Sequence, residues 1–496
     1  MWKPTAAALA LLILSGAAAA DERSACERLL RKLDSQLADA SCVESPDLTT
    51  RNPDTTPADD SLPGLPPSAF MPQADRDILV ADPAHRPPIK KAVPGLQIQA
   101  RFAKDPLGQA RFLLRLPKDW NGRLVVAGAS GARSEFNGDF VWSDYVLQQG
   151  YAYASQNKGV LSAYASTAAD PLACRTGTPD NPHYVHYYDD DPGQEFTRWR
   201  DFMVMASDLA RRGVEAQYGR KPRYTYAVGA SNGGYQVRRA IETAPEYFDG
   251  GVEWAGTFVD PRGPSLLTDL PPAILNYPDY LASDFSPTST AALNILAAGY
   301  PPDLVADTAN GPVSLWSKHA DSFWKPTQCQ WQKRLDPGYD TYGAGPGRYN
   351  YLARLSASTV GNNVAAIATD GKIKRPLITV AGTMDALLPI DHHARAYARQ
   401  VAAEGGEHAQ AYRLYEIQNG NHVERYAKIF PKLELIEPHA QHAFDLLVRY
   451  VEQKTPLPPD QCVARGGAIS DAPTQLGHCP NLLVPIEPAR NHRCDR

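Results

Sequence analysis

The residues best suited to catalysis stand in one five-residue stretch, GASNG, at positions 229–233. An apolar, β-branched and aromatic run at 224–228 precedes this stretch, and helix-compatible sequence follows it. A G-x-S-x-G pattern between a strand and a helix is typical of a nucleophile elbow, a tight turn that presents a strained serine for attack. Because the pattern also recurs by chance in ordinary Gly-rich turns, it indicates a nucleophile at Ser231 only if catalytic partners follow in the chain.

Such partners are needed because a serine hydroxyl is a poor nucleophile unless a base takes its proton and an acid orients that base. Asp385 comes four residues after a strand-like run that ends at Ala381, and His422 comes five residues after a run that ends at Ile417. The order serine, acid, histidine is the order in which strand-borne triads of this elbow type occur. We therefore predict Ser231 as the nucleophile, Asp385 as the orienting acid and His422 as the general base.

Other side chains compete for the roles of acid and base. Asp391 also follows the strand, but "PIDHHARAYARQ" places it at the predicted N-cap of the next helix, where aspartate is common for structural reasons. His392 and His393 fall in the first turn of that helix, and we expect them to be exposed. The sequence therefore favours Asp385 as the acid and His422 as the base.

The negative charge that develops on an attacked carbonyl oxygen also needs hydrogen-bond donors. In an elbow of this type, one donor is the backbone N–H of the residue after the nucleophile, here Asn232. The second donor comes from a loop that follows an early strand, and the matching loop is "AGASGA" at 127–132. We predict Gly131 as this second donor.

Two histidine-containing segments could in principle bind a metal. "HYVHYYDDDPG" at 183–193 combines two histidines with three aspartates, but a solvated loop that ends in a helix cap at Asp191 is the favoured interpretation. His439 and His442 lie one helical turn apart, yet no carboxylate or cysteine nearby completes a site, so we expect surface positions. The sequence predicts no cofactor and no bound metal.

The elements that must position these residues alternate between strand-like and helix-like sequence, which indicates a mostly parallel sheet with flanking helices. Between 261 and 373 the alternation fades, as expected of an inserted lid. An amphipathic helix is expected from Ser24 to Ala38, ahead of a Pro-rich linker. The predicted organisation is a signal peptide at 1–20, an N-terminal helix and linker at 21–96, a core at 97–260, the lid at 261–373, the second part of the core at 374–455 and a Cys-containing tail at 456–496.

The start of the chain is typical of a cleavable secretory signal, with Lys3, an apolar run at 6–14 and three alanines at 18–20. Cleavage would leave 49 Lys and Arg residues against 55 Asp and Glu residues, a formal charge of −6. This balance argues against nucleic acid or an anionic membrane as the partner. We expect a secreted or periplasmic protein.

The seven cysteines should then pair in an oxidising compartment, and the odd count leaves one over or joined to another chain. Connectivity is not deducible from the sequence. Close spacing makes Cys26 with Cys42 and Cys462 with Cys479 the easiest pairs to propose, and Cys174 with Cys329 is a long-range third. Because no two cysteines have C-x-x-C spacing, structural bridges are favoured over a zinc or redox site.

Over positions 116–256 and 376–424 the chain resembles the tannase and feruloyl esterase family of α/β-hydrolases. The likeness is carried by "LPKDWNGRLVVAGASG", "GYAYASQNKG", "YGRKPRYTYAVGASNGGYQVRRAIETAPEYFDGGVEWAG" and "NGNHVE". The resemblance implies an α/β-hydrolase fold and the hydrolysis of esters, often of aromatic acids, by a serine nucleophile beneath a large lid. The expected partner is a small-molecule or oligomeric ester.

Two features depart from the pattern of that family. Its members commonly carry disulfide-bonded cysteines directly before the catalytic serine and histidine, where this chain has Ala230 and Asn421. The inserted segment also lacks the D-G-x-x-D-G stretch that resembles a calcium loop in relatives, so no calcium is expected. Secreted hydrolases of short polyester oligomers, such as 3-hydroxybutyrate oligomers, have a similar "SNGG" elbow and are the first alternative. A non-catalytic binding protein on the same scaffold is the second.

Aromatic side chains near the predicted site bear on the choice of substrate. Trp316, Phe323 and Trp324 lie in the inserted segment, and Trp254 ends a strand of the core. Flat walls of this kind would favour a flat acyl group, although the same residues could equally form the core of the lid. The sequence therefore predicts esters of hydroxylated benzoic or cinnamic acids in preference to 3-hydroxybutyrate oligomers.

Overall fold

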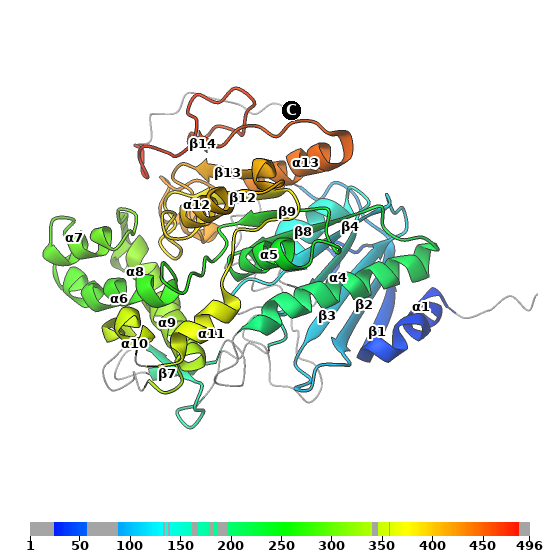
Figure 1. Cartoon of the computed structure of the whole chain (residues 1–496), viewed down its shortest axis with the longest axis horizontal. Helices are drawn as coiled ribbons and strands as arrows, with labels where there is room; N and C mark the ends of the chain where they lie inside the picture. Colours follow the sequence, from blue (N-terminus) through cyan, green and yellow to red (C-terminus); the bar gives the residue numbers. More distant parts are fainter. Residues whose placement is uncertain are drawn as a thin grey trace, which may run out of the picture.

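The structure is a computed structural model of the whole chain (Figure 1). It describes residues 24–56, 88–131, 134–136, 139–160, 167–177, 182–186, 196–339, 346–356 and 358–485. The predicted signal peptide and most of the loop at 183–193 lie outside the described residues. None of the described helices combines the length and the apolar character that crossing a bilayer requires.

A ten-stranded sheet forms the centre of the molecule, in the order β1-β2-β3-β5-β4-β8-β9-β12-β13-β14. The strands from β5 through β4 to β14 are parallel, and β1, β2 and β3 pair antiparallel at one edge. The predicted mostly parallel sheet is therefore confirmed. The strands are β1 Leu37–Ser45, β2 Gly95–Phe102, β3 Arg111–Pro117, β4 Arg123–Gly128, β5 Ala152–Gln156, β8 Tyr224–Ala230, β9 Gly250–Trp254, β12 Leu377–Gly382, β13 Tyr412–Ile417 and β14 Gln461–Val463.

Helices cover both faces of this sheet, as the near-continuous apolar sequence of its inner strands requires. In β4, Leu124 and Val126 pack into one core, whereas Val125 and Ala127 pack into the core on the opposite face. Because side chains alternate along a strand, one run of sequence supplies both layers. The first face carries α1 Ala25–Leu33, α4 Thr197–Tyr218, α5 Asn232–Thr243 and α12 Ala394–Glu404, and the second carries α3 Asp144–Leu147 and α13 Glu437–Gln453.

The N-terminal segment differs from the prediction. The helix expected to reach Ala38 ends at Leu33, and Leu37 begins β1, which pairs antiparallel with β2 at the edge of the sheet. A capping box at Ser24 starts the helix, and a disulfide ties it to β1. The leucine at position 37 fits the helical spacing, but it is buried by strand pairing instead.

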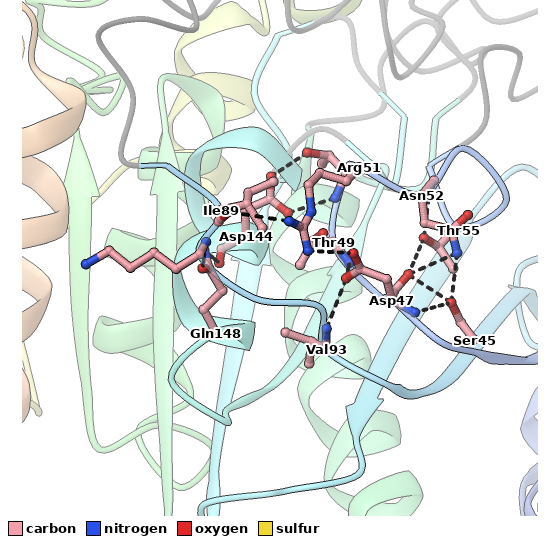
Figure 2. Close-up of polar contacts among 12 residues, drawn as sticks. Ser45, Asp47, Thr49, Arg51, Asn52, Thr55, Ile89, Val93, Asp144 and Gln148 are labelled. Atoms are coloured by element: carbon pink, nitrogen blue, oxygen red, sulfur yellow. Dashed lines mark hydrogen bonds and ion pairs between the residues drawn. The ribbon is translucent and has the colours of Figure 1, made fainter.

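The chain between β1 and β2 is anchored by the carboxylate of Asp47 (Figure 2). Its Oδ1 accepts hydrogen bonds from the backbone N–H of Thr49 and of Val93, at 3.1 and 3.0 Å, and its Oδ2 accepts one from Arg51 at 3.0 Å. Although burial opposes this effect, the bonds from the Val93 and Thr49 amides hold the pKa of Asp47 below its usual value. One side chain thus joins the segment after β1 to the segment that leads into β2.

The segment between β9 and β12 is mainly helical and gathers at one side of the sheet, on the left in Figure 1. Trp316, Trp324 and Trp331 pack in its apolar core, together with Met384 and Leu388 from the loop after β12. This core therefore includes residues of the predicted catalytic loop. The elements are α6 Leu266–Ala282, α7 Thr290–Ala297, β10 Val305–Thr308, β11 Gly311–Ser314, α8 Leu315–His319, the π-helix η4 Ala320–Trp324, α9 Lys325–Leu335, α10 Tyr351–Leu355 and α11 Val360–Ile367.

The described residues form three disulfides, and they are the three pairs that were expected: Cys26–Cys42 and Cys462–Cys479 at close spacing and Cys174–Cys329 at long range. The second spans 155 residues and joins β6 Cys174–Gly177 to α9. The third lies in the C-terminal segment, where the sequence predicted only a tail and the structure has β14, paired with β13. Cys494 lies outside the described residues.

Candidate active site

The sheet brings the ends of β8, β12 and β13 to one edge. These strands run parallel, with β9 between β8 and β12, so their carboxyl ends face the same side of the molecule. Ser231 follows β8 directly, while Asp385 and His422 lie in the loops after β12 and β13. The topology therefore directs all three predicted catalytic residues to one region.

Ser231 occupies a strained turn between β8 and α5. Its φ of 57° and ψ of −123° lie in a region that non-glycine residues rarely adopt. Its N–H donates to the carbonyl of Trp254 at 2.9 Å, and its carbonyl accepts from Tyr235 N–H at 3.0 Å. The flanking glycines are sterically required, since a Cβ at Gly229 would lie 2.3 Å from the carbonyl oxygen of Gly233. The stretch has the local geometry predicted for an elbow.

Asp385 and His422 form a buried pair. Nδ1 of the imidazole lies 2.7 Å from Oδ2 of the carboxylate, and the two side chains are only 8% and 2% exposed, in the order histidine and aspartate. The other carboxylate oxygen accepts from the N–H groups of Leu387 and Leu388, at 2.9 and 2.7 Å. Both oxygens of Asp385 are therefore engaged, which fixes the orientation of the imidazole.

The Ser231 hydroxyl makes no hydrogen bond to His422 in the described part of the chain. In unliganded enzymes such a bond is often long and tightens only when substrate binds. The three residues share one sheet edge, and a contact between the Ser231 hydroxyl and His422 would complete a catalytic triad.

The competing acid is placed elsewhere. Helix α12 begins at Ala394 with His393 as its N-cap, so Asp391 is not the helix cap that the sequence predicted. Its carboxylate pairs with Arg395 at 3.1 Å and is about half exposed. The ion pair one turn along the chain accounts for Asp391 without a catalytic role.

The chain thus has a strand, a turn with a serine and a helix, and an aspartate and a histidine follow two later strands. The sheet is mostly parallel, and helices cover both of its faces. An esterase from Aspergillus oryzae of known structure matches with a TM-score of 0.50 over 87% of this chain and 90% of that chain, at 14% identity. The chain has an α/β-hydrolase fold. The fold that the family resemblance implied is confirmed.

Two sequence matches and a second solved structure complete the comparisons. A family model described as 3HB-oligomer hydrolase matches residues 290–489 of this α/β-hydrolase. The D-(-)-3-hydroxybutyrate oligomer hydrolase of Burkholderia thailandensis is 33% identical over 122 residues, which are 23% of this chain and 17% of that relative. The chain thus matches under a fifth of the relative's length. Feruloyl esterase B from Aspergillus oryzae matches with a TM-score of 0.45 at 13% identity, over 86% of this chain and 91% of that chain.

The predicted oxyanion donors lie on two neighbouring elements of the α/β-hydrolase core. Asn232 is the first residue of α5, and its side chain accepts from the hydroxyl of Thr257 at 2.9 Å. Gly131 lies in the loop after β4, which is tied to α5 because Gln236 donates to the carbonyl of Ala129 at 2.8 Å. Their joint use as an oxyanion hole stays a prediction.

Lys158 is a residue of this region that the sequence reasoning missed. It follows β5, is fully buried and has a φ of 65°. Its ammonium donates to the carbonyl oxygens of Ser130 and Gly131 and lies 5.6 Å from the ring of Trp199. The local sequence gives no signal for this role, because an Asn-Lys-Gly turn after a strand is typical of an exposed loop.

The aromatic candidates are not equivalent. Trp316 donates to the carbonyl of Pro301 at 3.1 Å, and Trp324 donates to that of Ala386 at 2.8 Å. Both indoles are buried in the core of the inserted segment, as is Trp254 at the end of β9 in the core of the sheet. Phe323 alone of the four is half-buried. The packing favours a structural role for the tryptophans and leaves Phe323 as the substrate-contact candidate.

The histidines expected at the surface are largely covered. His393 is buried and His392 half-buried, because the inserted segment places Asp269 of α6 beside both rings, at 3.3 and 3.1 Å. On α13, His439 is buried and His442 half-buried. Burial lowers the pKa of His439 to about 4. The predicted exposure of these side chains was wrong because tertiary packing, invisible in the local sequence, covers them.

Metal binding finds no support in the part of the chain that the structure describes, where no group of three or more His, Cys, Asp or Glu side chains is arranged to hold an ion. Of the two histidines in the loop at 183–193, His186 has a described side chain, and it pairs with Asp170 at 2.9 Å. Asp191 lies outside the described residues.

Proposed function

We propose that this protein is a serine esterase that hydrolyses carboxylic esters through an acyl-enzyme. The observation that carries the proposal is the 2.7 Å contact between His422 and Asp385, on the sheet edge where Ser231 occupies a strained turn. Nucleophilic acyl transfer needs a carboxylate-oriented imidazole that can reach a strained serine, and both groups lie on the same sheet edge here. The esterase and hydrolase names of the similar proteins support this reaction class.

In the proposed mechanism, Nε2 of His422 accepts the proton of Ser231 as the hydroxyl oxygen attacks the ester carbonyl. Asp385 holds the proton on Nδ1 and stabilises the imidazolium. The N–H groups of Asn232 and Gly131 stabilise the oxyanion. His422 then protonates the departing alcohol, and water, deprotonated by the same histidine, attacks the acyl-enzyme to release the acid.

The test is Ser231→Ala, compared with Ser356→Ala, whose serine is exposed on the inserted segment. With p-nitrophenyl acetate, Ser231→Ala should lose the burst of released nitrophenol and on the order of 10⁴-fold or more in kcat. The control should retain both. Turnover by Ser231→Ala close to that of the unaltered protein would refute the serine mechanism. The same assay with a serine-directed organophosphate separates an esterase from a binding protein on the same scaffold.

Two substrate classes compete. Aromatic acid esters were predicted from the sequence, but the tryptophans that suggested a flat wall pack inside the protein. Short 3-hydroxybutyrate oligomers are favoured by the family-model match, because residues 290–489 include both Asp385 and His422. We propose aromatic acid esters as the first candidate substrates and short 3-hydroxybutyrate oligomers as the second. Values of kcat/KM for methyl gallate, methyl ferulate and a 3-hydroxybutyrate trimer under one condition decide between the classes.

Export is proposed as well. Three disulfides are expected of a protein that folds in an oxidising compartment. Expression of the full chain in a bacterium, followed by mass spectrometry of the N-terminus in each cell fraction, tests for cleavage near Asp21. Full-length protein confined to the cytoplasm would contradict this proposal.

A further inference from the structure

His319 is a buried histidine that the proposed mechanism does not use. It ends α8 in the inserted segment, directly before the π-helix η4, and its side chain is fully buried. Its ring packs against Tyr426 and Phe323, with ring centroids 5.4 and 5.5 Å apart. Because the hydroxyl of Tyr426 donates to the carbonyl of Lys318 at 3.2 Å, α8 is held against the loop that carries His422.

Neither ring nitrogen of His319 has a hydrogen-bond partner in the described part of the chain. The same holds for Oδ1 of Asn421, whose Nδ2 donates to the carbonyl of Val423 at 3.0 Å. A buried polar atom without a partner costs about 1–3 kcal/mol, so native proteins rarely leave one without a reason. Here three such atoms belong to two side chains, one of which directly precedes the proposed catalytic base.

The two side chains lie within electrostatic reach of the catalytic pair. Burial lowers the pKa of His319 to about 3, and the charge of Asp385 and the neighbouring Asn421 side chain offset only part of this effect. Asn421 lies near the ring without making a hydrogen bond of normal geometry to it. The imidazole is therefore neutral near pH 7, with one N–H donor and one acceptor nitrogen. Asn421 Oδ1 adds a second acceptor.

We propose that His319 and Asn421 bind a hydroxyl group of the ester substrate beside the scissile bond, so that the enzyme selects hydroxylated esters. This inference rests on the proposed esterase function. A hydroxyl group donates one hydrogen bond and accepts others, which matches a neutral imidazole and an amide oxygen. A carboxylate or phosphate would instead need a cationic or donor-only site, which a neutral histidine and an amide oxygen do not supply.

The imidazole is covered in the unliganded protein, so a hydroxyl group reaches it only after a neighbouring side chain moves. Phe323 contacts the ring and is only half-buried. It belongs to a π-helix, an element that often occurs at functional sites. Rotation of this one side chain is the proposed route of access.

The experiment compares hydroxylated esters with their deoxy counterparts. The pairs are methyl 3-hydroxybutyrate with methyl butyrate, methyl gallate with methyl benzoate, and 4-hydroxybutyl butyrate with butyl butyrate. They place the hydroxyl group on an aliphatic acyl chain, on an aromatic acyl ring and on the alcohol, respectively. A site built to bond a hydroxyl strongly rejects the analogue that lacks it, so we expect a preference on the order of 10²-fold or more in kcat/KM for at least one pair.

In His319→Phe that preference should fall to about threefold or less, while kcat/KM for the deoxy ester changes little. His319→Gln keeps a donor and an acceptor and should retain part of the preference. His439→Phe is the matched control, since it removes a buried neutral histidine from α13 and should leave the preference intact. Urea unfolding of each variant checks that it is folded.

An unaltered preference in folded His319→Phe would overturn the assignment and leave His319 a structural residue. Equal rates for all three pairs in the unaltered enzyme would also overturn it, whether or not the variants fold. Failure of the esterase proposal would give a different result, because the unaltered protein and Ser231→Ala would then cleave a deoxy ester at the same rate.

Discussion

The buried ammonium of Lys158 donates a hydrogen bond to the carbonyl oxygen of Gly131, the predicted oxyanion donor. It also donates to the carbonyl oxygen of Ser130. Because the C=O and N–H of a trans peptide point in opposite directions, the bond to Ser130 fixes the direction of the Gly131 N–H. Lys158 is therefore expected to position this donor without touching the substrate.

Lys158→Met should lower kcat by about 10- to 100-fold and change KM much less, since an oxyanion donor acts mainly in the transition state. Lys104→Met, at an exposed lysine, is the control. Steady-state kinetics with p-nitrophenyl acetate separate the two constants. If kcat of the variant returned to that of the unaltered enzyme at a lower temperature, at which the variant is fully folded, Lys158 would have a packing role instead.

The Asp385 carboxylate is expected to keep the proton of the neutral His422 imidazole on Nδ1. Asp385→Asn keeps the size of the side chain but can present an N–H to the imidazole, so kcat should fall on the order of 10⁴-fold with folding retained. Asp391→Asn, at the competing acid, should leave kcat within about twofold. If Asp391→Asn were the damaging change, the acid would have been assigned to the wrong residue.

The shared sheet edge of the three proposed catalytic residues could be predicted from the sequence, because parallel strands end at one edge and a residue shortly after each strand lies there. Ser231, Asp385 and His422 depend on that rule alone. Two of the three cysteine pairs were the easiest to propose, since they bridge only 16 and 17 residues. Short loops leave few alternatives.

His319 and Lys158 were not readable, because each acquires its meaning from a distant contact. His319 sits in a segment without clear periodicity and meets Asn421 only through the packing of α8 on the core. From the sequence, Lys158 is expected to be a charged residue in an exposed turn, and only the packing of the loop after β4 against it shows that it is buried. Strand β1 was missed because it is a half-exposed edge strand without an apolar run, and β14 was missed because it is only three residues long.

A buried ionic contact joins the inserted segment to the core and should give stability a defined pH window. His392 Nδ1 lies 3.1 Å from Asp269 Oδ1, and this contact outweighs burial, so that the pKa of His392 is raised. Although burial opposes it, the contacts with His392 and His393 lower the pKa of Asp269. The contribution of Asp269 to folding stability is present above its usual pKa of 3.8 and is lost as pH falls through its pKa in the folded protein. The contribution of His392 to folding stability is present below its usual pKa of 6.5 and is lost as pH rises through its pKa in the folded protein.

Asp269→Asn should therefore destabilise the protein most between about pH 4 and 6.5, by about 1–2 kcal/mol, since it leaves the charge of a half-buried histidine unpaired. Urea unfolding of both proteins from pH 4 to 9 measures the difference. A difference that stays constant across this range would mean that the contact is not ionic.

The Asp47 carboxylate should stabilise the N-terminal part of the sheet (Figure 2). Asp47→Ala removes the acceptor for the backbone N–H of Thr49 and of Val93, and the free energy of unfolding should fall by about 1–3 kcal/mol. Because the folded pKa of Asp47 is lowered, its contribution is present above the usual value of 3.8 and is lost as pH falls through the folded value. The stability lost in Asp47→Ala should therefore be smaller in acid.

Asp54→Ala, at an exposed position in the same segment, is the matched control and should change stability by less than about 0.5 kcal/mol. An equal loss for both variants at pH 7, measured by urea unfolding, would show that the network around Asp47 does not hold this segment.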